Sequence, residues 1–111
     1  MSQQGQYLNT NTSSILQPYR DQLDSINLQI VDLLSERMKV CMDIAELKAA
    51  HGIAMMQPGR ISYVIDMIKG RSEAVGLRPE YIESIFGIII NETCIREDAL
   101  IKQRLTQGRT P

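Results

Sequence analysis

Two cations of the sequence stand on a helical stripe that is otherwise apolar. The stripe begins at Leu23 and continues at intervals of three and four residues, the spacing of one face of an amphipathic helix. Arg37 and Lys48 lie on it eleven positions apart, which is almost three helical turns. Both side chains therefore point towards the apolar face, where an unpaired charge is costly.

A carboxylic acid has a similar position further along the chain. Glu97 follows Thr93 by four residues on an apolar face, and Arg20 and Arg60 add two further cations. Four cations and one acid do not balance, so the set fits a pocket for a ligand with several negative charges. The alternative is structural: internal salt bridges, for example between Glu97 and Lys48, or long stems on the surface with their charged ends in water.

The composition excludes several other kinds of function. The chain has 111 residues with 12 basic and 13 acidic side chains, whereas a nucleic-acid binder needs a basic excess. One histidine, His51, is too few for most histidine metal sites, and Cys41 and Cys94 are too far apart for a zinc pair. No apolar run reaches the roughly 18 residues of a membrane helix. We therefore expect one small cytoplasmic domain with no metal, cofactor, nucleic-acid partner or membrane association.

Three helices are predicted to position these side chains. Helical periodicity covers residues 14–51, 59–75 and 79–105, and no segment alternates with a period of two. Gly52 and Gly76 are expected to end the first two helices, because glycine is favoured just past a helix end. The predicted fold class is all-α.

The ends of the chain and the helix faces lead to further expectations. Residues 1–13 are polar and predicted to be a disordered tail, residues 14–107 form the helical domain, and residues 108–111 are a short C-terminal tail. Pro18 suits the first turn of a helix, where its missing N–H costs nothing. The faces expected to be apolar comprise Ile61, Val64, Ile65, Ile68 and Val75 in the second helix, and Ile82, Phe86, Ile89, Ile90, Leu100 and Ile101 in the third. The residues expected on solvated faces are Arg71, Arg78, Lys102 and Arg104.

The first helix is too long for a compact domain of this size. The run between Pro18 and Gly52, which no Gly or Pro interrupts, has 33 residues, and at ~1.5 Å each these make a rod of ~50 Å. A domain of this length has a diameter of only ~35 Å. The overhanging apolar stripe needs a cover, and a homodimer in which the long helices pack together supplies one. Pairing with a different coiled-coil partner would also cover it.

Nearly the whole helical region resembles the all-helical chorismate mutases. The resemblance runs without a gap over roughly residues 16–104 and is carried by YRDQLDSINLQIVDLLSERMKVCMDIAELKAAHGI and GLRPEYIESIFGIIINETCIRE. It implies three helices per protomer in an intertwined homodimer with two composite sites. It also implies a Claisen rearrangement of a small dicarboxylate, in which a C–O bond breaks while a C–C bond forms.

The resemblance also implies a role for each matching residue. Arg37 from one protomer and Arg20 from the other would bind the two carboxylates, and Arg60 would help to close the loop side. Lys48 would donate to the ether oxygen and to a carboxylate, and Thr93 matches a hydroxyl position that contacts a carboxylate. Such a reaction requires a compact substrate geometry and stabilisation of negative charge on the ether oxygen.

Glu97 matches a family position that usually holds Gln and sometimes Glu. A Gln donates an N–H to the ether oxygen at any pH, whereas a carboxylate would repel the developing charge. Glu97 is therefore expected to act only when protonated, a form that burial and a dianionic substrate both favour.

Two departures from the family pattern concern the part of the site that faces the substrate's C4 substituent. Many members have an Asp and a Glu there, whereas this chain has Gln57 and Ile61. The motif MMQPGR at residues 55–60, together with Glu97 followed by Asp98, resembles a subgroup that acts on 4-amino-4-deoxychorismate and feeds p-aminophenylalanine units into natural products.

Three alternative functions are open. The first is ordinary chorismate mutase activity, the conversion of chorismate to prephenate. Isochorismate pyruvate-lyase shares the scaffold, with Ile61 in its favour and Glu97 against it. The last is a non-catalytic helical dimerisation module in which the charges on the stripes form salt bridges between chains.

Overall fold

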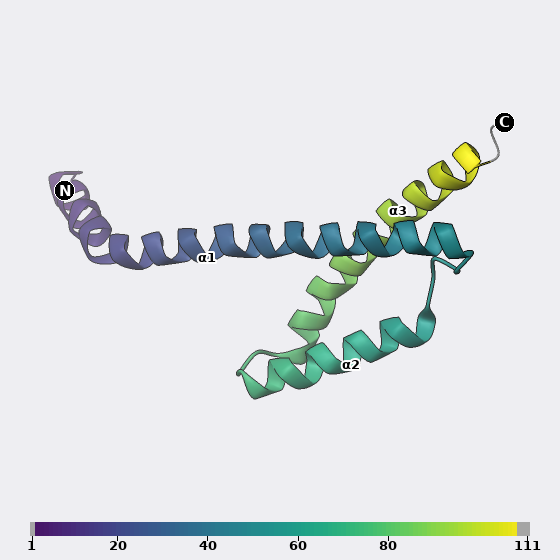
Figure 1. The fold of residues 1–111 in the computed structure, drawn as a ribbon. Helices are drawn as coiled ribbons and strands as arrows, with labels where there is room; N and C mark the ends of the chain where they lie inside the picture. The colour runs from purple at the N-terminus through teal and green to yellow at the C-terminus, as the bar shows by residue number, and fades with distance from the viewer. Residues whose placement is uncertain (1, 109–111) are drawn as a thin grey trace. The chain divides into compact units, whose positions relative to one another are not determined.

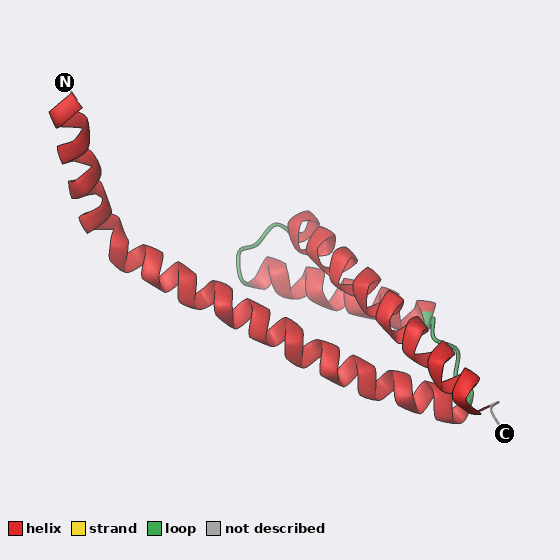
Figure 2. Cartoon of the chain, turned by 90° about the horizontal axis from the view of Figure 1, so that it is seen from above, coloured by secondary structure: helices red, strands yellow, loops and turns green. Residues whose placement is uncertain are grey.

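The computed structural model describes residues 2–108, with side chains from residue 12 onwards. Three helices account for nearly all of them: α1 (Ser2–His51), α2 (Pro58–Ala74) and α3 (Pro79–Gly108) (Figure 1). The described residues contain no strand, as the colouring of Figure 2 shows. The predicted all-α class is therefore confirmed. None of these helices is long and apolar enough to cross a membrane.

The helix boundaries agree with the sequence prediction to within one residue, except at the start of α1 and the end of α3. The predicted start at residue 14 is wrong, because α1 begins at Ser2. An established helix extends at little cost through residues without strong breakers. Pro18 consequently lies inside α1 and not in its first turn, and the purple N-terminal end of α1 bends in Figure 1. A proline ring removes one helical hydrogen bond and commonly bends the helix there.

The predicted tails are only partly within the described residues. Met1 and residues 109–111 lie outside them. Gly108 is the last residue of α3, so the third helix runs slightly beyond its predicted end near residue 105. The assignment of residues 1–13 to a tail outside the domain stays a prediction.

The chain consists of two structural units, Met1–Arg37 and Met38–Pro111. In the described part of the first unit the only element is a stretch of α1. A lone helix has nothing within its unit against which to bury an apolar face. Its exposed large apolar residues are Ile15, Leu16, Tyr19, Leu23, Ile26, Leu28, Ile30, Val31, Leu33 and Leu34.

The second unit contains the end of α1, the whole of α2 and the whole of α3. Helices α2 and α3 pack against each other, and the predicted apolar residues of both are half-buried, except Val75, which is exposed. Among the described residues, Ala45 on α1 is the one apolar side chain that is completely buried. The core is therefore thin, and most of its aliphatic side chains are covered on one side only.

Glycines end the first two helices, as predicted. Gly76 has φ 79°, and the amides of Gly76 and Leu77 donate to the carbonyls of Glu73 and Ser72, which is a complete Schellman motif. Gly52 has φ 63°, and the amide of Ile53 donates to the Lys48 carbonyl at 2.9 Å. Both positions require the left-handed backbone that glycine adopts without strain.

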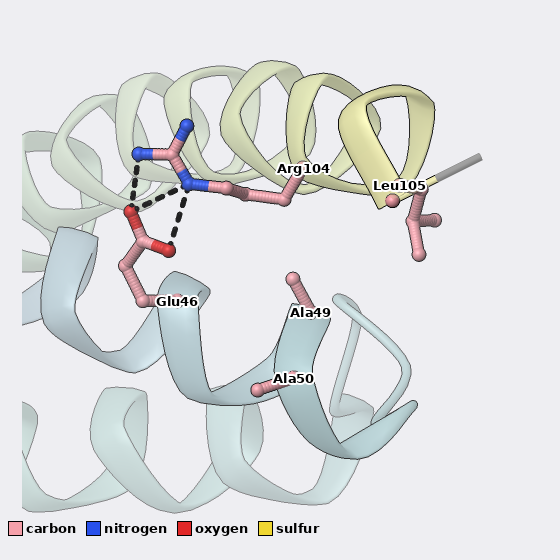
Figure 3. Close-up of a pocket in the computed structure, with 6 residues that line it drawn as sticks. Glu46, Ala49, Ala50, Arg104 and Leu105 are labelled. Carbon is pink, nitrogen blue, oxygen red and sulfur yellow. Dashed lines mark hydrogen bonds and ion pairs between the residues drawn. The ribbon is translucent and has the colours of Figure 1, made fainter. Parts of the chain in front are cut away.

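An exposed ion pair joins α1 to α3 near the ends of both helices. Nε and Nη2 of Arg104 donate to the Glu46 carboxylate at 2.7 to 3.0 Å (Figure 3). The hydrogen bond from Arg104 lowers the pKa of Glu46, and the same contact raises the pKa of Arg104. The Arg104 side chain is 39% exposed, in keeping with its expected place on a solvated face. The pair lines an open pocket of about 410 Å³ that none of the predicted site residues borders.

Candidate functional site

The second unit brings Lys48 of α1 and Glu97 of α3 into direct contact. Lys48 Nζ lies 3.0 Å from Glu97 Oε1, and the two side chains are only 14% and 9% exposed. The residues are 49 positions apart in the sequence. This is the internal ion pair that the structural alternative predicts, and it also places a cation and an acid at one point, as the ligand-binding interpretation requires.

Lys48 also holds the loop between α1 and α2. Its Nζ donates to the Met55 carbonyl at 2.8 Å. An ammonium group has three N–H donors, and these two contacts use two of them. One donor is left for a further acceptor, so Lys48 can keep the loop and the acid in place while it binds a ligand.

Thr93 and Glu97 are both buried on α3, one turn apart. Their exposed fractions are 5% and 7%, and together with Ser72 they are the buried polar residues of the described chain. Thr93 Oγ1 donates to the Ile89 carbonyl at 2.9 Å, and Ser72 Oγ donates to the Lys69 carbonyl. To donate to a carboxylate, the Thr93 hydroxyl must rotate away from its own helix.

The start of α2 positions Gln57, Arg60 and Ile61 together. Gln57 is the N-cap residue, and its backbone carbonyl accepts hydrogen bonds from the amides of Arg60 and Ile61 at 3.0 and 3.2 Å. Its side-chain Nε2 donates to the Ala54 carbonyl at 2.9 Å. The other end of this amide group, Oε1, therefore points away from the Ala54 carbonyl. Ile61 is half-buried, whereas Gln57 and Arg60 are exposed.

The other two predicted arginines belong to the first unit. Arg20 is exposed and Arg37 is half-buried there. Their contribution to a site with Lys48 and Glu97 stays a prediction. In the part of the chain that the structure describes, no three His, Cys, Asp or Glu side chains come together as metal ligands.

Sequence reasoning missed three contacts around these residues. The carbonyls of Ala54 and Met55 are acceptors whose place in the loop no side-chain pattern reveals. The third is the ring of Tyr63, which faces the Arg60 guanidinium. Its spacing of three residues on a helix was a usable signal, because such neighbours meet on the helix surface.

The comparison with known families decides between a scaffold and an enzyme. The sequence model of the family described as chorismate mutase type II matches residues 19–107. This chain belongs to the chorismate mutase type II family. It is therefore an isomerase of that family, and the resemblance of its helices to these enzymes is confirmed.

Individual relatives of this chorismate mutase family member bear different names. It is 33% identical over 88 residues to a 4-amino-4-deoxychorismate mutase of Streptomyces venezuelae, a match that covers 79% of this chain and 85% of the relative. A protein of the same name from Streptomyces pristinaespiralis is also 33% identical, with coverage of 78% and 67%. A chorismate mutase of Methanocaldococcus jannaschii is 31% identical, with coverage of 79% and 85%.

The buried ion pair leads to a prediction about stability. In Lys48→Met the Glu97 carboxylate loses its cation, and we expect the free energy of unfolding to fall by about 3 kcal/mol at neutral pH. Glu97→Gln keeps an oxygen that accepts from Lys48, so its loss should be smaller. Urea unfolding followed by circular dichroism measures both.

Lys102→Met is the matched control for the ion pair. Lys102 pairs with Asp98 at 2.9 Å, but its side chain is 74% exposed, so little change in stability is expected. If Lys48→Met and Lys102→Met lowered the free energy of unfolding equally, the buried pair would contribute no more to stability than the exposed one.

Proposed function

We propose that the protein catalyses the Claisen rearrangement of 4-amino-4-deoxychorismate to 4-amino-4-deoxyprephenate. The observation that carries this choice is the orientation of the Gln57 amide, together with the names of the two Streptomyces relatives. We place the reaction in the cytoplasm, where it would supply precursors of p-aminophenylalanine units for antibiotic-type natural products.

Gln57 would read the C4 substituent of the substrate as an acceptor. One of the two N–H donors of its Nε2 is used by the Ala54 carbonyl, and its Oε1 is an acceptor for a donor on the ligand. An amino group offers more N–H donors than the single O–H of a hydroxyl group. The neighbouring Ile61 adds no acceptor of its own.

Chorismate is the second candidate substrate. Its C4 hydroxyl can also donate to Gln57 Oε1, and the Methanocaldococcus jannaschii relative is named a chorismate mutase. The two substrates differ only in the C4 substituent, so the same Lys48, Glu97 and arginines would bind either one.

The chemistry in this proposal rests on position and electrostatics. Arg37, Arg20 and Arg60 bind the two carboxylates and hold the substrate compact, so that the carbon atoms that must bond lie close together. The remaining N–H of Lys48 donates to the ether oxygen, where negative charge grows as the C–O bond breaks. Thr93 contacts a carboxylate. One bond breaks and one forms within the same molecule, so no group leaves the substrate.

The substrate proposal is tested with purified protein and three separate compounds. We expect kcat/KM for 4-amino-4-deoxychorismate to exceed that for chorismate about tenfold, the value of one additional hydrogen bond, and isochorismate to yield no pyruvate. Products are identified by chromatography and mass spectrometry. A higher kcat/KM for chorismate would replace the proposed substrate by the second candidate.

Two variants of the binding residues are the controls for this assay. Arg37→Ala and Lys48→Ala should abolish turnover of every substrate while the far-ultraviolet circular dichroism still shows a helical protein. Full activity in either variant would show that the assigned site is wrong.

Glu97 leads to a prediction about pH. Glu97 Oε1 accepts a hydrogen bond from Lys48 Nζ in the substrate-free protein, but Glu97 must be protonated to donate to the ether oxygen. If Glu97 has this role, kcat/KM should fall as the pH rises, because a carboxylic acid then loses the proton that it donates. Glu97→Gln carries its N–H donors at every pH, so its profile should be flatter. A wild-type profile without pH dependence would remove Glu97 from this role.

We further propose that two copies of the chain share each site. The first unit exposes its apolar residues along a single helix, and burying such a stripe against a second copy is the simplest way to remove it from water. The same stretch of helix carries Arg20. In the homodimer Arg20 of one protomer would enter the site that contains Lys48 of the other.

Mixing two inactive variants tests the shared site. When Arg20→Ala and Lys48→Ala are unfolded together and refolded, about half of the dimers are hybrids, each with one intact site of two. We expect about a quarter of wild-type activity to return. If Arg20 acted within its own protomer, every site would carry a defect and no activity would return. A monomer in sedimentation experiments would exclude the sharing altogether.

A further inference from the structure

Arg60 contacts an aromatic ring, and none of the ion pairs among the described residues includes it. Its guanidinium carbon lies 5.1 Å from the centroid of the Tyr63 ring, within the range of an attractive cation–π contact. The two residues are about one turn apart in the first half of α2. Both are exposed, Tyr63 by 59%, so a ligand can reach them.

The kind of contact determines what Arg60 has left for a ligand. A ring that faces the guanidinium leaves its N–H donors, which lie in the guanidinium plane, available for a carboxylate. Arg104 shows the opposite case, because its Nε and Nη2 donate to Glu46. A salt bridge of that kind would both use the donors and neutralise the charge.

The sequence around Arg60 contains no acid that could compete for it. The positions three and four residues further along the helix are Tyr63 and Val64, and those three and four residues earlier, at and before the N-cap, are Gln57 and Met56. These are the places where an Asp or Glu would pair with Arg60 on the helix surface. The contact with Tyr63 therefore adds no negative charge beside the guanidinium of Arg60.

We propose that Tyr63 is a positioning residue that holds Arg60 ready for a substrate carboxylate. The inference rests on the proposed function, in which Arg60 binds that carboxylate. Tyr63 itself is not a catalytic residue. It acts through Arg60, and its effect belongs to substrate binding more than to the chemical step.

Kinetics of two substitutions at Tyr63, with 4-amino-4-deoxychorismate as substrate, test this role. Tyr63→Leu removes the aromatic face and should raise KM about two- to fivefold with kcat unchanged. Tyr63→Phe keeps the face and should retain the wild-type KM. The matched control is Tyr81→Leu, since Tyr81 is an exposed tyrosine on α3, and it should change neither constant.

The same variants in an Arg60→Ala background separate positioning from a general effect. If Tyr63 acts through Arg60, Tyr63→Leu should have no further effect on KM there. An unchanged KM in Tyr63→Leu, an equal rise in Tyr63→Phe, or the same rise in the Arg60→Ala background would each overturn the inference.

Nuclear magnetic resonance of the substrate-free protein tests the stacking without any turnover. The ring should shift the Arg60 side-chain resonances, and the shift should persist in Tyr63→Phe and vanish in Tyr63→Leu. Unshifted Arg60 resonances in the wild type would overturn the inference. If the wild-type protein turns over neither the amino substrate nor chorismate, the proposed function fails and the role of Tyr63 fails with it. If the enzyme is active but Tyr63→Leu behaves like wild type, only the inference about Tyr63 fails.

Discussion

The contact between Lys48 and Glu97 is the constraint on which the rest of the second unit depends. Two charged groups removed from water cost free energy that their mutual attraction must offset, and here they are almost fully covered. The pair ties α1 to α3, and the second bond of Lys48 ties the same point to the loop at Met55. The second unit has little completely buried apolar surface. The polar contacts of Lys48 therefore do much to fix α1, α3 and the loop relative to one another.

The residues at the two ends of the loop between α1 and α2 help to bring the Met55 carbonyl to Lys48. Gly52 ends α1 in the left-handed conformation, and Gln57 begins α2 as its N-cap residue. Only four residues separate these two, so the chain has little freedom between them. The Met55 carbonyl accepts a hydrogen bond from Lys48, and Gln57, Arg60 and Ile61 follow at the start of α2.

Much of this arrangement could be predicted from the sequence. Helical periodicity identified α2 and α3 and their packed faces, and the charges on apolar stripes identified Lys48 and Glu97 as partners. The start of α1 was missed, because a polar run before a proline has the local pattern of a disordered tail. An existing helix can nevertheless continue through such a run. The Arg104 contact with Glu46 was missed as well, since the two lie 58 positions apart and no local pattern links them.

The anchor of the loop has a consequence for how the protein can change over evolutionary time. Lys48 binds residue 55 through the main-chain carbonyl, an atom that every amino acid possesses. Substitutions of the side chain there leave the anchor itself intact, and Gln57 can be exchanged two positions further on without breaking it. Under the proposed function, the loop can therefore acquire a new preference for the substrate's C4 substituent by single mutations, while Lys48 keeps its position and its hydrogen bond to the main chain.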